Sequence, residues 1–230
     1  MVISLALLNF FYKNIMEIPS SAFNDILQEL QRRPLHVNNY RKRTGDGRSQ
    51  CFGLVNRRSE PVDWSRWCWI RPKLYFHLQE FARQYVDIPW TSITVNHNYQ
   101  AKMHKDKGNE GESFLVAFGD YDGGDLKIYE GDLSGNHNIK HKPIKADFGK
   151  VYHSVEPFTG TRYSLVFYTL KRKAPPTLPE GKVVVEEGKY WFKRGDKLMK
   201  TTDHLEDHPM AKGNSAYMKK IQGNHIVSFE

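Results

Sequence analysis

Two histidines and one aspartate are the residues of this chain whose types and order could bind a metal. His104 and Asp106 lie two residues apart, the spacing at which an extended strand points two side chains to the same side. Such a pair arises by chance about as often as it is seen in a chain of this composition. His153 follows later, and two histidines with one carboxylate form the facial triad that binds non-haem Fe(II) and leaves three coordination positions open.

An arginine and a serine follow His153 in a run that is typical of a β-strand. Arg162 and Ser164 are two residues apart, so they would share one face of that strand. There they could hold the far carboxylate of an oxo-acid through charge-assisted hydrogen bonds. The order His-x-Asp, His, Arg-x-Ser matches what a 2-oxoglutarate oxygenase requires.

Other groups of histidine, acidic and cysteine residues in the chain have simpler explanations than a metal site. His204 and His208 are one helical turn apart, but the glutamate between them is misplaced for the zinc protease pattern His-Glu-x-x-His, which indicates a surface cluster. The run GDYDGGD at 119–125 resembles the start of a calcium loop but lacks the later glutamate, so a tight turn is expected. Cys51 and Cys68 can build neither a disulfide framework nor a cysteine-based zinc module, which suits a reducing, intracellular compartment.

Two amphipathic helices are predicted ahead of these residues. One is capped by Ser20 or Ser21 and ends at Pro34, and the other, within 71–87, has Pro72 in its first turn. Their apolar faces are formed by Phe23, Ile26, Leu27 and Leu30, and by Leu74, Leu78, Phe81 and Tyr85.

After Pro89 the sequence is typical of short strands separated by turns. The predicted strands are 90–98, 113–121, 124–130, 142–148, 150–158 and 161–170. Because no helices intervene, the pattern indicates an antiparallel barrel or sandwich, in a mainly β fold with flanking α-helices.

Composition predicts four regions. These are an N-terminal helical and basic region at 1–89 that packs on the core, a β core at 90–173, a Pro-rich linker at 174–181, and a small C-terminal accessory region at 182–230. The last region is expected to contain a hairpin that turns at Glu187-Gly188 or at Gly195-Asp196.

The N-terminal apolar stretch is too short for a membrane span and lacks the features of a secretory signal. It is interpreted either as a buried strand or as residues upstream of the true start codon, in which case Met16 rather than Met1 would be the first residue. We therefore expect an intracellular protein, in the nucleus or in a viral or cytoplasmic compartment, without a membrane partner.

The net charge of +8 is concentrated between Arg32 and Lys73, where eleven basic residues stand against three acidic ones. Aromatic residues are interleaved with them: Tyr40, Phe52, Trp64, Trp67, Trp69 and Tyr75. Cations that neutralise phosphates, mixed with aromatic faces on which bases stack, are typical of a nucleic-acid surface. A solvated basic face above core tryptophans explains the same pattern equally well.

Residues 90–170 resemble the double-stranded β-helix (jelly-roll) core of Fe(II)/2-oxoglutarate dioxygenases. Within that superfamily, HKDKGNEGES at 104–113 is similar to the His-x-Asp-x-x-Asn and Gly-Ser/Thr run of TET catalytic domains. RYSLVFY at 162–168 resembles the Arg-Ile-Ser-Leu-Val-Phe/Leu-Tyr strand of the branch that contains the TET proteins and the base J thymine hydroxylases. The cysteine-rich region and the long insert of TET proteins are absent, and the basic segment 32–73 stands in place of the former.

The resemblance implies a role for each matching residue. His104, Asp106 and His153 would ligate Fe(II), and Arg162 and Ser164 would bind the 5-carboxylate of the co-substrate 2-oxoglutarate. Asn109 would contact the target base. Asn96 and Asn98, just ahead of the motif, alternate so as to face one side. Asn96 is expected at the cofactor, and Asn98 and Ser113 at the substrate.

The leading expectation is a monomeric dioxygenase that hydroxylates the methyl group of 5-methylcytosine or thymine in a nucleic acid, with DNA as the expected partner, and releases succinate and CO2. A dioxygenase of the same fold that acts on a protein side chain or a small molecule is the first alternative. A β-sandwich binding protein with a degenerate site is the second.

Overall fold

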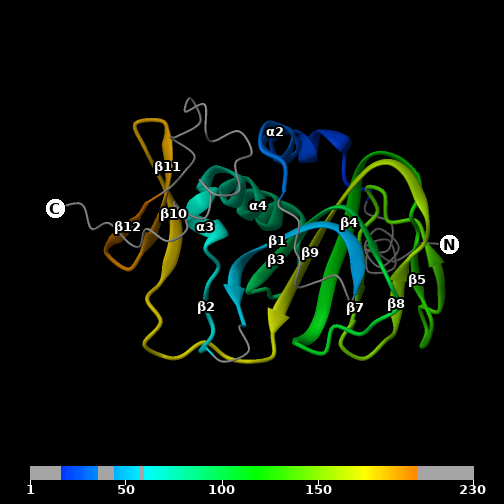
Figure 1. The fold of residues 1–230 in the computed structure, drawn as a ribbon. Coiled ribbons are helices and arrows are strands. Elements are labelled where there is room, and N and C mark those ends of the chain that lie inside the picture. Colours follow the sequence, from blue (N-terminus) through cyan, green and yellow to red (C-terminus); the bar gives the residue numbers. More distant parts are fainter. Residues whose placement is uncertain (1–16, 36–43, 57–59, 201–230) are drawn as a thin grey trace, which may run out of the picture.

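The computed structural model describes residues 17–35, 44–56 and 60–200. Two antiparallel sheets lie against each other, and helices cover the outer face of the larger one (Figure 1). The expectations for Met1, Met16 and Tyr40, and for the cluster His204 to His208, lie outside the described residues.

The larger sheet has the strand order β2-β1-β3-β9-β4-β7. Its strands are β1 (Gly45–Val55), β2 (Asp63–Trp64), β3 (Ser92–Ala101), β4 (Asn109–Gly123), β7 (Ile144–Ala146) and β9 (Phe158–Leu170). The smaller sheet, ordered β6-β5-β8, consists of β5 (Leu126–Ile128), β6 (Gly135–His137) and β8 (His153–Val155). This mainly β arrangement confirms the predicted fold class.

Helices form the layer above the larger sheet. They are η1 (Ser20–Phe23), α2 (Asn24–Arg32), α3 (Trp67–Ile70) and α4 (Pro72–Tyr85). Pro72 occupies the first turn of α4 as predicted. The predicted serine cap of the first helix is wrong, because Pro19 precedes η1 and no side chain caps either η1 or α2.

Successive side chains of β9 point alternately toward the helices and toward the space between the two sheets. Tyr163, Leu165 and Phe167 belong to the core beneath the helices, where Phe167 stacks on Phe81 at 5.9 Å between ring centroids. Arg162, Ser164, Val166 and Tyr168 line the opposite side, between the two sheets. The same strand therefore holds the helix layer and carries the polar residues of the site.

The described aromatic residues of the basic segment are buried or half-buried. Phe52 and Tyr75 are buried, and Trp64 and Trp69 pack against Phe192 at 5.5 and 6.1 Å between ring centroids. Residues 45–55 of the segment form strand β1, which the sequence pattern did not predict. The core interpretation of these aromatic residues is therefore confirmed.

Residues 181–199 form a third small sheet at one end of the molecule (Figure 1). Its strands are β10 (Gly181–Glu186), β11 (Lys189–Arg194) and β12 (Lys197–Met199), so both predicted turns are present. Phe192 of β11 is fully buried in the same core as the helices. Among the described residues, no helix is long and apolar enough to cross a membrane.

Candidate metal centre

His104 and His153 are brought together by backbone pairing. The N–H of each donates to the carbonyl of the other, at 3.0 Å in both directions. His104 follows the end of β3, His153 begins β8, and Asp106 is fixed by a 2.8 Å hydrogen bond from its N–H to the carbonyl of Phe148. The three predicted metal ligands thus lie where the two sheets meet.

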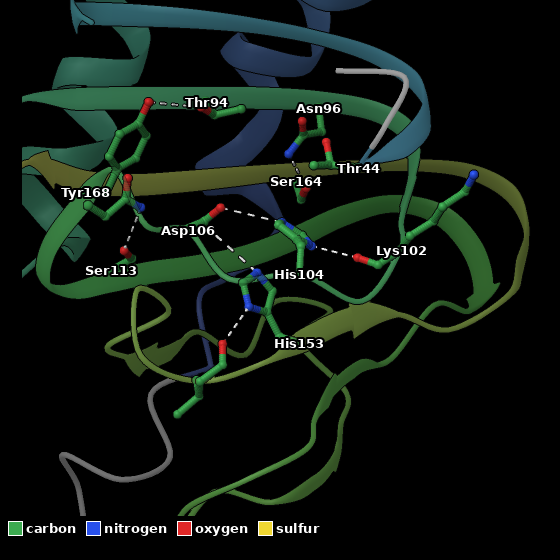
Figure 2. Close-up of polar contacts among 12 residues, drawn as sticks. Thr44, Thr94, Asn96, Lys102, His104, Asp106, Ser113, His153, Ser164 and Tyr168 are labelled. Atoms are coloured by element: carbon green, nitrogen blue, oxygen red, sulfur yellow. Dashed lines mark hydrogen bonds and ion pairs between the residues drawn. The ribbon is translucent and has the colours of Figure 1, made fainter. Parts of the chain in front are cut away.

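The ring nitrogens of both histidines are oriented by carbonyl groups (Figure 2). Nδ1 of His104 lies 2.6 Å from the carbonyl oxygen of Lys102, and Nδ1 of His153 lies 3.3 Å from that of Val151. A carbonyl only accepts, so Nδ1 carries the proton in each neutral ring and Nε2 keeps its lone pair. Both histidines are therefore in the tautomer that a metal ion needs at Nε2.

The carboxylate of Asp106 faces both Nε2 atoms. Oδ1 is 3.4 Å from Nε2 of His104, and Oδ2 is 3.9 Å from Nε2 of His153. The ligand atoms of the three residues all lie within 4.8 Å of one another. Neighbouring ligands at roughly 2.1 Å from one octahedral ion are about 3 Å apart, so the three side chains would move slightly closer together on binding. Two imidazoles and one carboxylate are a donor set that suits a divalent metal such as Fe(II).

A cavity of about 310 Å³ opens beside these three residues. Its inner end is closed by Arg162, which is 2 % exposed. Burial lowers the pKa of the guanidinium, and Tyr121 opposes that shift. Within the described part of the chain, Nε and Nη2 of Arg162 have no hydrogen-bond partner. A buried cation with unsatisfied donors is a favourable site for an anion, and a carboxylate matches its planar fork.

Gly124 makes room for the Arg162 side chain. A Cβ at this position would lie 2.9 Å from Nε of Arg162, and the backbone φ of +70° favours glycine. Gly124 belongs to the turn between β4 and β5, so the predicted tight turn is present, although residues 119–123 are still part of β4. The guanidinium lies 5.4 Å from the ring centroid of Tyr121 and 5.7 Å from that of Phe158.

Asn96 and Ser164 form the cavity wall next to Arg162. They are paired in the β3–β9 register, and Nδ2 of Asn96 donates to Oγ of Ser164 at 3.2 Å. Oδ1 of Asn96 is buried and has no hydrogen-bond partner among the described residues. Both residues therefore lie where the sequence placed a cofactor subsite.

The structure places the three predicted substrate residues differently from one another. Asn109 lines the cavity, whereas Ser113 is fully buried behind it, 3.5 Å from Nδ2 of Asn109. Asn98 is exposed and does not line the cavity. Its φ of +48° breaks the alternation of β3, and its Oδ1 accepts the N–H of Arg162 at 2.7 Å. The prediction that Asn96 and Asn98 face the same side is therefore wrong. Asn98 instead holds the backbone of β9 at Arg162 through this hydrogen bond.

Sequence reasoning missed two residues of the outer cavity wall. Cys51 and Thr94 face each other in the β1–β3 register, and both approach the hydroxyl of Tyr168, at 3.3 and 3.5 Å. Thr94 precedes Asn96 by two residues, a signal that it shares the same face. Cys51 could not be placed because β1 was not predicted.

Comparison with known proteins finds no matching family model and no match among curated proteins. Similar folds occur in solved structures. An oxidoreductase of the 2OG-Fe(II) oxygenase family from Burkholderia pseudomallei has a TM-score of 0.48 at 15% identity, over 73% of this chain and 92% of that one. NgTET1 in complex with 5mC DNA gives 0.47 at 12%, over 69% and 72%. A Pseudomonas putida prolyl-4-hydroxylase gives 0.43 at 16%, over 69% and 90%.

Proposed function

We propose that this protein is an Fe(II)- and 2-oxoglutarate-dependent dioxygenase that hydroxylates the methyl group of 5-methylcytosine or thymine in a nucleic acid. The observation that carries the proposal is the presence of Arg162, buried with unsatisfied donors, in the same cavity as the ligand atoms of His104, Asp106 and His153. One end of the cavity then binds an anion and its side wall binds a metal.

Each residue has a defined task in this proposal. His104 and His153 present Nε2, and Asp106 supplies the anionic oxygen that a divalent metal prefers. Arg162 and the hydroxyl of Ser164 hold the 5-carboxylate of 2-oxoglutarate, with the carboxamide of Asn96 beside them. Because Arg162 and Ser164 are buried, water is excluded from this end, which strengthens the ion pair.

When bound, Fe(II) activates dioxygen so that one oxygen atom enters succinate, formed from 2-oxoglutarate with loss of CO2, and the other enters the substrate as hydroxyl. The protein's remaining task is to present one C–H bond to that site. A cavity of about 310 Å³ lies at the small end of the range for ligand pockets. A base within a duplex would therefore have to be flipped out to reach it.

The carboxamide of Asn109 supports a base as the substrate, because it lines the cavity and can both donate to and accept from a base edge. The alternative, hydroxylation of a protein side chain or small molecule, is favoured by a different observation. The described aromatic residues of the segment 32–73 are buried in the core or packed against it, so they offer bases little stacking surface there.

The direct test is incubation of the purified protein with Fe(II), 2-oxoglutarate and DNA that contains 5-methylcytosine, followed by digestion to nucleosides and mass spectrometry. Hydroxylated 5-methylcytosine or thymine, formed together with succinate, is the expected result. Succinate without a modified nucleoside would support the alternative substrates. Absence of both products would contradict the dioxygenase assignment, and Arg162→Gln serves as the matched inactive control.

A further inference from the structure

The cavity opens at the end that is distant from Arg162. Along β9 the cavity-facing side chains become more accessible in order: Arg162 and Ser164 are buried, whereas Val166 and Tyr168 are half-buried. Asn109 is also half-buried at this end, where it pairs with Leu170 in the β4–β9 register. A substrate therefore enters past Tyr168 and Asn109.

Four basic residues are close in sequence to the cavity residues Asp106, Asn109 and Tyr168, and we call them the basic rim: Lys107, Lys171, Arg172 and Lys173. All four are exposed. They come from two segments that a backbone hydrogen bond joins, since the N–H of Lys171 donates to the carbonyl of Gly108 at 2.9 Å. The rim thus lies between the metal ligand Asp106 and the cavity residue Asn109 on one segment, and directly after β9 on the other.

The charge of the basic rim is only partly neutralised within the protein. Lys173 forms an ion pair with Glu110, and Arg172 donates to Oδ1 of Asn56 at 3.2 Å. The amide of Asn56 is neutral, so that contact leaves the positive charge of Arg172 uncompensated. Among the described residues, Glu110 is the acidic residue that pairs with the basic rim, and its partner is Lys173. Positive charge therefore remains at the mouth of the cavity.

Three basic residues of the segment 32–73, by contrast, are held by contacts within the protein. Arg71 is buried and donates to the carbonyl of Glu29 at 2.7 Å, and Arg32 and Lys73 pair with the Glu29 carboxylate at 2.6 and 2.9 Å. Arg71 is therefore unavailable to a phosphate, whereas Arg32 and Lys73 are held by Glu29 but remain about one third exposed. Arg41, Lys42 and Arg43 lie outside the described residues.

We propose that the basic rim binds the phosphates of the nucleic-acid strand on either side of the base that enters the cavity. The inference rests on the proposed function, and it names the surface through which the protein would bind a polyanionic partner. Exposed Lys and Arg side chains bind phosphates without reading sequence, so the basic rim fixes the position of the strand while the cavity selects the base.

The test compares two double variants of the full chain that remove the same charge. Lys171→Gln with Arg172→Gln neutralises half of the basic rim, and Lys182→Gln with Lys189→Gln removes two exposed lysines from the β10–β11 hairpin. Binding of a fluorescein-labelled oligonucleotide is measured by anisotropy at several salt concentrations. The rim variant should lose roughly 1.4 to 1.8 units of the slope of log K against log salt, for single-stranded and duplex DNA respectively. The hairpin variant should keep the wild-type slope.

Equal slopes for the two variants would overturn the proposal. It would also be overturned if poly-glutamate bound with the same affinity and the same dependence on the rim as DNA, because the surface would then serve an acidic protein. Nucleoside analysis separates this inference from the proposed function. Base oxidation at low salt that the rim variant retains at the wild-type level overturns the basic rim alone. Rim-dependent DNA binding without any oxidised base supports the rim and contradicts the assigned reaction.

Discussion

His104 and His153 exchange both of their backbone hydrogen bonds, and their rings lie 4.3 Å apart between centroids. This single pairing connects the end of β3 in the larger sheet to β8 in the smaller one. Because the backbone, not the side chains, makes the connection, a ligand can be removed from the site while the two sheets stay joined. Metal binding and folding can therefore be tested separately.

Replacement of His153 by alanine is expected to abolish metal-dependent turnover and to weaken Fe(II) or Co(II) binding by more than about 100-fold. Loss of a group that supports a metal ligand lowers metal affinity 10- to 100-fold, and loss of the ligand itself lowers it further. Anaerobic titration calorimetry measures the affinity, and circular dichroism verifies the fold. His137→Ala, a change at a histidine of β6 outside the triad, is the matched control, and unchanged affinity in His153→Ala would remove this residue from the site.

Arg162→Gln is expected to abolish the stabilisation that 2-oxoglutarate gives to the folded protein. At a ligand concentration of 100 Kd, the wild type should gain about 2.7 kcal/mol, which raises Tm by roughly 5 to 10 °C in a chain of this size. The variant should show almost no shift. Without ligand it should be at least as stable as the wild type, since a buried cation with unsatisfied donors has been removed.

Arg71→Gln is the control for this experiment, because Arg71 is equally buried but has protein partners, the carbonyl of Glu29 and Oε1 of Gln50. It should lower Tm in the absence of ligand and keep the shift that 2-oxoglutarate induces. A normal ligand shift in Arg162→Gln would show that the co-substrate binds elsewhere.

Glu29 is expected to make the stability of the helix layer dependent on pH. Burial by itself would raise the pKa of its carboxyl, but hydrogen bonds from Lys73 and Arg32 outweigh that effect and lower the pKa. A folded-state pKa below the unfolded value gives stability that is present above the unfolded pKa and is lost as pH falls through the folded one.

Glu29→Gln should therefore cost about 1 to 2 kcal/mol of unfolding free energy at pH 7. The difference from the wild type should shrink as the pH is lowered below about 4, where the wild-type carboxyl becomes neutral too. Urea unfolding at several pH values measures it, with Glu80→Gln on the exposed ion pair with Arg83 as the control. If the difference in unfolding free energy stayed constant from pH 7 to pH 3, the charge of Glu29 would not contribute to stability.

The strands that carry the site could be predicted because each has a strong local pattern. In β9, polar and apolar residues alternate, so the common face of Arg162 and Ser164 followed from spacing alone. Strand β1 gave no such signal, since it is interrupted by Gly47 and Gly53, both with positive φ, and forms because β3 pairs with it. The orientation of Asn98 could not be predicted either, because its left-handed conformation depends on that pairing.

The C-terminal hairpin was expected to be a separate accessory region, and the burial of Phe192 leads to a sharper prediction. Its ring packs against those of Trp64, Trp69 and Tyr75, at 5.5 to 6.1 Å between centroids. Phe192→Ala should therefore destabilise the whole protein by about 3 to 5 kcal/mol in urea unfolding, in one cooperative transition. Val185→Ala, on the exposed side of the hairpin, should cost less than about 0.5 kcal/mol.

If the hairpin were independent, Phe192→Ala would instead produce two transitions and leave the main one at the wild-type midpoint. A single shifted midpoint, with 2-oxoglutarate binding retained in the folded fraction, would make the hairpin part of the core that supports the cavity.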